Sequence, residues 1–202
     1  MSKKNGANRG MANPSKLKAL DADDKQMLRV VIETPKGSRN KFAFNQDEHV
    51  FELKTVLPAG MAFPYDFGFV PSTEADDGDP VDVLVLMDEP AYPGVVLSCR
   101  PIGVIEGEQV DKTAKDKDKT EKNKDKAQKD KTKKVRNDRI VAVEQEAHSW
   151  ADIKTIDDLG KHFLRELEAF FVQYHQLSAT QYRVLDVKGP GHARNLVKSS
   201  KQ

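Results

Sequence analysis

No hydrophobic core can be built from residues 111–134. This segment contains eleven Lys, six acidic residues and no aromatic or large aliphatic side chain, for a net charge of +5. Such a composition cannot bury enough apolar surface to offset the conformational entropy that is lost on folding. We therefore expect a disordered insertion, rich in Lys and Asp, that interrupts a single folded body.

Charge is distributed unevenly along the rest of the chain. Residues 1–25 hold six basic and three acidic residues without an apolar pattern, so we expect a disordered basic tail. The 153 residues outside this tail and the insertion carry −7, whereas the whole chain carries +1. The folded body, expected over residues 26–195 with a short tail at 196–202, is therefore acidic. An acidic body argues against nucleic acid as a partner and suits a metal-dependent enzyme.

Cysteine content and hydropathy exclude other classes of protein. The single cysteine, Cys99, excludes a framework of intramolecular disulfides. No uncharged apolar run is long enough to span a bilayer, and residues 1–16 lack the apolar region of a signal peptide. We therefore expect a cytoplasmic protein with no membrane partner.

Hydrophobic periodicity predicts several short strands and one long helix. β-branched and apolar residues favour strands over residues 27–34, 42–44, 50–57, 82–87, 94–105, 139–143 and 182–187. Apolar residues recur every three or four positions over 155–177, which predicts an amphipathic helix with Thr155 as its N-cap. The strands at 94–105 and 139–143 flank the insertion, which would lie at a hairpin tip. Together these elements predict an α+β fold, a closed or nearly closed small barrel with a packed helix.

An acidic turn is the sharpest chemical feature of the sequence. Asp77, Asp79 and Asp82 lie on a turn that Gly78 makes tight and Pro80 makes rigid, directly before a strand. Clustered carboxylates repel one another unless a cation is present, and Mg²⁺ prefers oxygen ligands. The pattern is equally compatible with an ordinary acidic turn.

A cationic cluster follows the first strand. Lys36, Arg39 and Lys41 could hold phosphate oxygens, and Gly37 would allow the backbone to approach closely. A basic hairpin turn is the plainer interpretation of the same residues.

The order of these motifs resembles the soluble family I inorganic pyrophosphatases over residues 27–106 and 137–188. The matching motifs are Val31-Ile32-Glu33-Thr34-Pro35, Phe63-Pro64-Tyr65-Asp66-Phe67-Gly68-Phe69, Asp77-Gly78-Asp79-Pro80-Val81-Asp82 and Cys99-Arg100-Pro101-Ile102-Gly103-Val104. The resemblance implies an OB-like five-stranded β-barrel with a flanking C-terminal helix. It also implies Mg²⁺-dependent hydrolysis of inorganic diphosphate to two phosphates, in an enzyme that usually forms homo-oligomers.

The resemblance also implies roles for individual residues. Asp77 and Asp82 would bind the activating metals, and Asp79 would contact the metals and take the proton of the attacking water. Glu33 would hold a further metal with the substrate. The phosphate-binding residues would be Lys36, Lys41, Lys54, Arg139 and Tyr174.

Two later aspartate ligands of the family have no direct counterpart here. The first would fall near Gln109, where the candidate substitutes are Glu106, Glu108 and Asp111. The second would fall on Asn137, with Asp138 adjacent. Since Mg²⁺ favours a charged oxygen over an amide, we expect a β-bulge to turn Asp138 towards the metals. Several residues around the expected phosphate-binding site also differ from those usual in the family. They are Ala43, Phe63, Phe67, His175 and Gln181.

These departures keep other functions open. The chain could hydrolyse another phosphoanhydride. Alternatively, a catalytically degenerate barrel could bind a polyanion or a protein, as OB-like barrels with basic grooves and aromatic faces do.

Overall fold

The computed structural model describes residues 13–111, 134–177 and 180–201. Most of the expected insertion, residues 112–133, and the first part of the expected tail, residues 1–12, lie outside the described residues. The strands are β1 (Leu28–Thr34), β2 (Asn40–Asn45), β3 (Val50–Val56), β4 (Asp66–Phe69), β5 (Asp82–Leu86), β6 (Val96–Asp111), β7 (Lys134–Arg136), β8 (Arg139–Glu144) and β9 (Thr180–Lys188). The helices are α1 (Gly160–Leu177) and α2 (Pro190–Ser199), with short 3₁₀ turns at Pro14–Lys16 and Ile156–Leu159.

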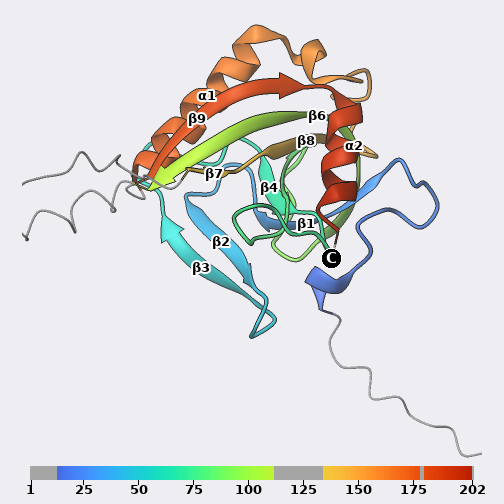
Figure 1. The fold of residues 1–202 in the computed structure, drawn as a ribbon, viewed down its shortest axis with the longest axis horizontal. Coiled ribbons are helices and arrows are strands. Elements are labelled where there is room, and N and C mark those ends of the chain that lie inside the picture. Colours follow the sequence, from blue (N-terminus) through green and yellow to red (C-terminus); the bar gives the residue numbers. More distant parts are fainter. Residues whose placement is uncertain (1–12, 112–133, 178–179, 202) are drawn as a thin grey trace, which may run out of the picture.

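Five of these strands close into a barrel. β1 pairs with β4, β4 with β5, β8 with β6 and β6 with β1, all antiparallel, while β5 and β8 are parallel. The expectation of an OB-like five-stranded barrel is therefore confirmed. The long β6 extends beyond the barrel, where it also pairs with β7 and β9 (Figure 1). β2 and β3 form a separate hairpin beside the barrel.

β5 shows why the barrel needs apolar residues on both faces of its strands. Val83 and Val85 pack into one buried cluster with Ile140, whereas Leu84 and Leu86 pack into a second one. The first cluster fills the barrel and the second lies beneath α1. Alternate residues of a strand point to opposite sides, so a strand covered by layers on both sides is apolar throughout.

α1 covers the outside of the barrel, as the periodicity predicts. Leu167 and Phe171, four positions apart, are both buried in the second cluster. The helix is preceded by a 3₁₀ turn whose Asp158 carboxylate accepts the backbone N–H of Thr155 at 2.8 Å. This contact satisfies an N–H that would otherwise lack a partner at the helix start.

Both ends of the described chain pack more closely than the sequence predicts. Ala19 is buried in the barrel cluster, and Leu20 forms a bridge with Leu28, so residues 13–25 are not a free tail. At the other end, α2 runs to Ser199 and buries Val197, so the body does not stop at residue 195. Short segments with one or two apolar contacts leave too weak a periodic pattern to detect from sequence.

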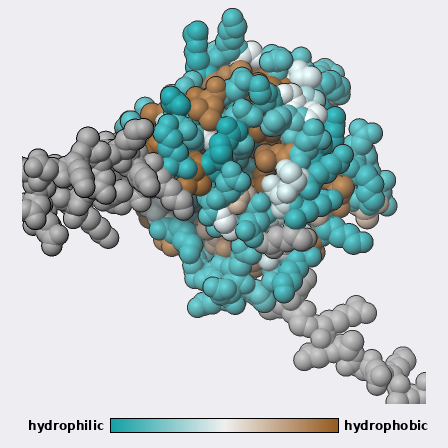
Figure 2. Space-filling view, in the orientation of Figure 1, coloured by the Kyte–Doolittle hydropathy of each residue, from teal (hydrophilic) through white to brown (hydrophobic). Residues whose placement is uncertain are grey.

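The surface shown in Figure 2 is mostly hydrophilic, with small hydrophobic patches between polar side chains. Among the residues that the structure describes, no helix has the length and apolar character needed to cross a membrane.

Candidate active site

A cavity of about 650 Å³ gathers eight of the ten residues that the sequence singles out. It opens between the barrel end, the β2–β3 hairpin and α1. The eight residues that line it are Glu33, Lys41, Lys54, Asp77, Asp79, Asp82, Arg139 and Tyr174. They come from six separate parts of the chain, so only the folded barrel brings them together.

The aspartate turn holds three carboxylates at the cavity. Gly78 has φ +89°, a left-handed conformation that residues with a Cβ rarely adopt. Its N–H donates to the carbonyl of Ala75 at 3.0 Å, and the N–H of Ala75 donates to the carbonyl of Asp79 at 2.7 Å. These contacts form a tight loop, from which Asp82 enters β5.

Burial leaves two of the carboxylates short of charge compensation. Burial raises the pKa of Glu33 to about 7, although its Oε1 accepts the N–H of Phe44 at 2.7 Å. Burial raises the pKa of Asp82 to about 6, against the opposing attraction of Arg139 and Lys41. The pKa of Asp77 is raised as well, first by burial. A bound cation would stabilise the ionised form of these buried carboxylates, whose pKa values are raised.

The donor set fits Mg²⁺. In the ranges that the structure describes, no three His, Cys, Asp or Glu side chains form a ready-made metal cage. Mg²⁺ rarely uses such a cage, because it binds one or two carboxylates and completes its octahedron with waters and substrate phosphates. Asp77, Asp79 and Asp82 at the mouth of one polar cavity supply that kind of partial set.

Cationic and phenolic groups stand near these carboxylates. The Nζ of Lys41 lies 5.2 Å from the centre of the Tyr174 ring. Burial opposes the charged form of Lys41, but Tyr174, Asp82 and Glu33 outweigh this effect and raise its pKa. Lys54 lies on β3 and pairs with Glu52 at 2.6 Å. Because its pKa is raised, Lys41 is charged at neutral pH.

Arg139 is almost completely buried beside the aspartates. Its guanidinium carbon lies 4.3 Å from the ring centre of Phe171 and 4.6 Å from that of Tyr182. Its Nε lies 3.7 Å from Oδ2 of Asp82. The two rings hold the flat guanidinium in one orientation, so its charge is directed towards the cavity.

His175 is a site residue that the sequence marked only as a departure. Its Nδ1–H donates to the carbonyl of Phe171 at 2.8 Å, and its ring stacks on Tyr182. Burial, followed by the charge of Arg139, lowers the pKa of His175 to about 4. The imidazole is therefore neutral at neutral pH. In the sequence, the only sign that His175 is buried is its position one helical turn after the apolar Phe171.

The structure does not bring Asp138 into the cavity, contrary to our expectation. Its Oδ1 accepts the N–H of Gly107 at 3.0 Å, and its Oδ2 accepts from Arg136 at 2.8 Å. Asn137 and Arg139 both line the cavity, so the alternation of side chains is regular and Asp138 faces the other way. A bulge does occur nearby, but on β9, where Leu185 is skipped between the pairs Glu106–Asp186 and Gly107–Val184, and it leaves the face of Asp138 unchanged.

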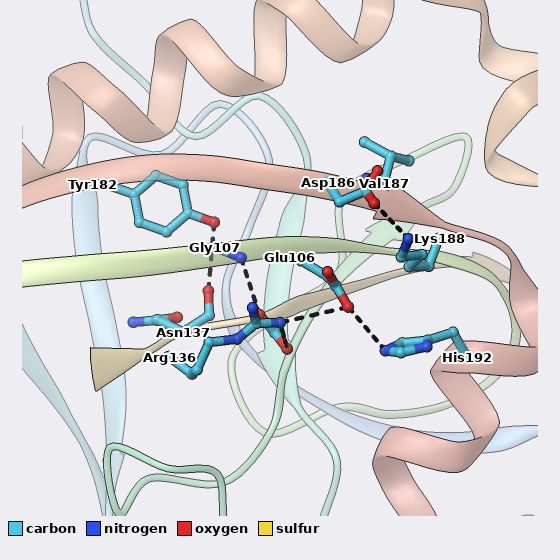
Figure 3. Close-up of polar contacts among 10 residues, drawn as sticks. Glu106, Gly107, Arg136, Asn137, Tyr182, Asp186, Val187, Lys188 and His192 are labelled. Carbon is cyan, nitrogen blue, oxygen red and sulfur yellow. Dashed lines mark hydrogen bonds and ion pairs between the residues drawn. The ribbon is translucent and has the colours of Figure 1, made fainter. Parts of the chain in front are cut away.

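The described substitutes for the first missing aspartate, Glu106 and Glu108, also lie away from the cavity. Glu106 contacts Arg136 at 3.5 Å and His192 at 3.1 Å, a group visible in Figure 3. Glu108 pairs with Lys134 and Arg183. The side chain of Asp111 is outside the described residues. The side chains of four alternatives are described, namely Glu106, Glu108, Asn137 and Asp138. Of these four, only Asn137 lines the cavity.

Lys36 is the other predicted site residue that does not line the cavity. It is exposed at the turn after β1. Arg39, from the same cationic cluster, donates from Nε and Nη2 to the carbonyl of Leu57 at 3.1 and 2.9 Å. Arg39 therefore ties the β2–β3 hairpin to the following loop, and Lys41 is the member of the cluster that faces the cavity.

Comparison with known proteins shows which family this chain resembles. A family model described as inorganic pyrophosphatase matches residues 30–202. The inorganic pyrophosphatase of Synechocystis is 35% identical over 162 residues, which cover 80% of this chain and 82% of that protein. The inorganic pyrophosphatase of Aquifex pyrophilus is 36% identical over 152 residues, or 74% of this chain and 73% of that protein.

Solved structures show the same likeness. The inorganic pyrophosphatase of Thermus thermophilus superposes with a TM-score of 0.76 at 29% identity, covering 94% of this chain and 97% of that one. The inorganic pyrophosphatase of Neisseria gonorrhoeae gives a TM-score of 0.72 at 30% identity, covering 91% of this chain and 94% of that one. The similarity therefore extends over more than nine-tenths of this chain.

Proposed function

The chain belongs to the inorganic pyrophosphatase family and is a hydrolase of the diphosphate bond, and we propose that it acts with Mg²⁺ held by Asp77, Asp79 and Asp82. The observation that carries this proposal is the convergence of three aspartates, Glu33 and three cationic side chains on one cavity. Such a cavity matches a substrate that is a polyanion bound together with divalent cations.

Asp79 is the proposed general base. It lies at the outer end of the aspartate turn, where its side chain is exposed to the cavity and to water. An ionised carboxylate in that place can accept the proton of an attacking water. Mg²⁺, when bound, lowers the pKa of water and polarises phosphate oxygens. Asp77 accepts the N–H of Asp79 at 3.3 Å within the turn, and Asp77 and Asp82 would supply oxygen ligands to the metal.

The cationic side chains are proposed to bind the substrate and to stabilise the departing phosphate. Lys41 and Arg139 are held rigidly by Tyr174 and by the Phe171–Tyr182 pair, so their charges need little reorganisation during the reaction. Lys54 is exposed and reaches the cavity from β3. Tyr174 supplies a hydroxyl that can donate to a phosphate oxygen.

A binding module for polyanions is not favoured. The cavity contains more carboxylates than cationic groups, which would repel a nucleic acid phosphate that arrives without metal ions. We further propose a cytoplasmic enzyme, supported by a single, buried cysteine and the hydrophilic surface.

Replacing the aspartates tests the proposal. Asp77→Asn, Asp79→Asn and Asp82→Asn should each lower Mg²⁺-dependent phosphate release from diphosphate by about a hundredfold or more, the scale of losing a catalytic group. The exposed Asp152→Asn should keep the rate of the unaltered protein. Near-normal rates in any two of the first three variants, with folding intact by circular dichroism, would refute the assignment.

A further inference from the structure

The carboxylates of the cavity are confined to one part of its lining. Glu33 comes from β1, Asp47 from the β2–β3 turn, and Asp77, Asp79 and Asp82 from the aspartate turn. The adjoining wall is built by β6, β8, β9 and the residues just before β8, and it contributes Gln109, Asn137, Arg139 and Thr180. Among the side chains that the structure describes on this wall, none is acidic.

Gln109 and Asn137 form a bonded pair at this wall, here called the amide pair. The Nδ2–H of Asn137 donates to Oε1 of Gln109 at 3.0 Å. The acceptor oxygen of Gln109 is thus already engaged by a neutral donor. A divalent cation that used this oxygen would share it with that donor and would gain only a neutral ligand.

The backbone of Asn137 is fixed on both sides. Its N–H donates to the carbonyl of Gly107 at 2.9 Å, and its carbonyl accepts the Tyr182 hydroxyl at 3.4 Å (Figure 3). A Cβ at Gly107 would lie 2.1 Å from the Tyr182 hydroxyl oxygen, so only glycine permits this contact. The amide pair therefore cannot reorganise easily around an ion.

Arg139 adds a positive charge to the same wall. It lies two residues from Asn137 on one face, and Nη1 donates to the Asn137 carbonyl at 3.3 Å. Like charges repel strongly where solvent is excluded, and Arg139 is 3% exposed. Asp82 lies 3.7 Å from Nε of Arg139 on the carboxylate side, but the described side chains of the wall add no carboxylate that would offset this charge beside the amide pair.

We propose that the amide pair excludes divalent cations from the β6–β8 wall and confines them to the carboxylate side of the cavity. This inference rests on the proposed function and specifies how its metal ions are distributed. The phosphoryl group of diphosphate that faces the amide pair is then bound by Arg139 and neutral amide donors. Neutral side chains thus determine how many metal ions the enzyme uses.

Counting bound Mn²⁺ tests the proposal without measuring activity. Free Mn²⁺ is quantified by electron paramagnetic resonance during titration of the full-length protein without substrate. The nearly isosteric Gln109→Glu/Asn137→Asp variant places two carboxylates on the wall, and it should bind one Mn²⁺ per chain more than the unaltered protein. A matched Gln26→Glu/Gln145→Glu variant adds the same charge at exposed positions away from the cavity and should bind no more than the unaltered protein.

A variant that removes a group from the wall completes the test. Asn137→Ala should leave the Mn²⁺ count unchanged. A lower count would overturn the proposal, because it would reveal a metal ligand on this wall. An unchanged count in the folded Gln109→Glu/Asn137→Asp variant would also overturn it. If that variant does not fold, Asn137→Asp and Asn137→Ala decide the question.

The two proposals fail in different ways. Normal hydrolysis of diphosphate together with a loss of Mn²⁺ in Asn137→Ala would overturn the amide-pair proposal alone. Undiminished hydrolysis in the aspartate variants would overturn the proposed function, whatever the Mn²⁺ count of the amide-pair variants.

Discussion

Asp138 and Asn137 are neighbours in sequence with opposite surroundings. Asp138 is bonded to Arg136 and to the N–H of Gly107, and it does not line the cavity. We expect Asp138→Asn to keep its Mg²⁺ activation within about twofold and to lower the free energy of unfolding by about 1 kcal/mol through the weakened contacts. Urea unfolding and a Mg²⁺ titration of activity measure the two effects. A large loss of Mg²⁺ activation would show that Asp138 acts at the cavity.

Glu33 makes the stability of the metal-free protein dependent on pH. Burial raises its pKa from 4.5 to about 7, so the folded protein retains a proton that the unfolded chain has released. The resulting stabilisation is complete below pH 4.5 and is lost as the pH rises through 7. Its size is on the order of 3 kcal/mol.

Denaturation in EDTA at pH 5 and pH 8 measures this effect. The unaltered protein should lose stability between the two values, and Glu33→Gln should lose much less. Glu89→Gln, at an exposed position, serves as the control and should behave as the unaltered protein does. Equal slopes in all three proteins would mean that Glu33 titrates normally. Mg²⁺ should stabilise the protein more at pH 8, because a cation competes with protons for the carboxylates.

At the scale of elements, α2 is part of the core and not a tail. Val197 is 1% exposed and packs with Ala193, one helical turn earlier, in the cluster that fills the barrel. Pro190 stands in the first turn of the helix, where its missing N–H costs nothing. We expect Val197→Ala to lower the free energy of unfolding by about 2 kcal/mol, as a cavity in a packed core does.

The control for this prediction is Val50→Ala. Val50 is 43% exposed on β3, so its truncation should cost less than about 0.5 kcal/mol. Thermal and urea unfolding of the two variants give the comparison. Equal, small losses would indicate that α2 detaches from the barrel in solution.

At the scale of the whole molecule, the segment 112–133 is expected to be dispensable. The strands on either side of it are paired, with Gln109 opposite Val135 and Val110 opposite Lys134. A short turn can therefore join them, and replacing 112–133 by Asn-Gly leaves a three-residue hairpin loop. Melting temperature and specific activity should stay close to those of the unaltered protein. A collapse of either, in a soluble and monodisperse variant, would assign the segment a structural or substrate-binding role.

Local features of this protein could be determined from its sequence alone. The aspartate turn depends on Gly78 and Pro80, which act on their immediate neighbours, and α1 follows from apolar residues spaced by one turn. Four of the five barrel strands were found because apolar residues on both faces, as in β5, leave a continuous signal. The four-residue β4 was not predicted as a strand. Motif order then indicated the family, and with it the barrel and most of the residues around the cavity.

Tertiary structure alone decided which neighbours face the cavity. Side chains on a strand alternate, so the places of Asn137 and Asp138 depend on the register between β6 and β8, and one bulge at the wrong position would exchange them. Lys36 and Arg39 were separated from Lys41 by the path of the β2–β3 hairpin. Ala19 and Val197 are buried because the barrel offers them a surface. Such contacts join residues far apart in sequence, and no local pattern records them.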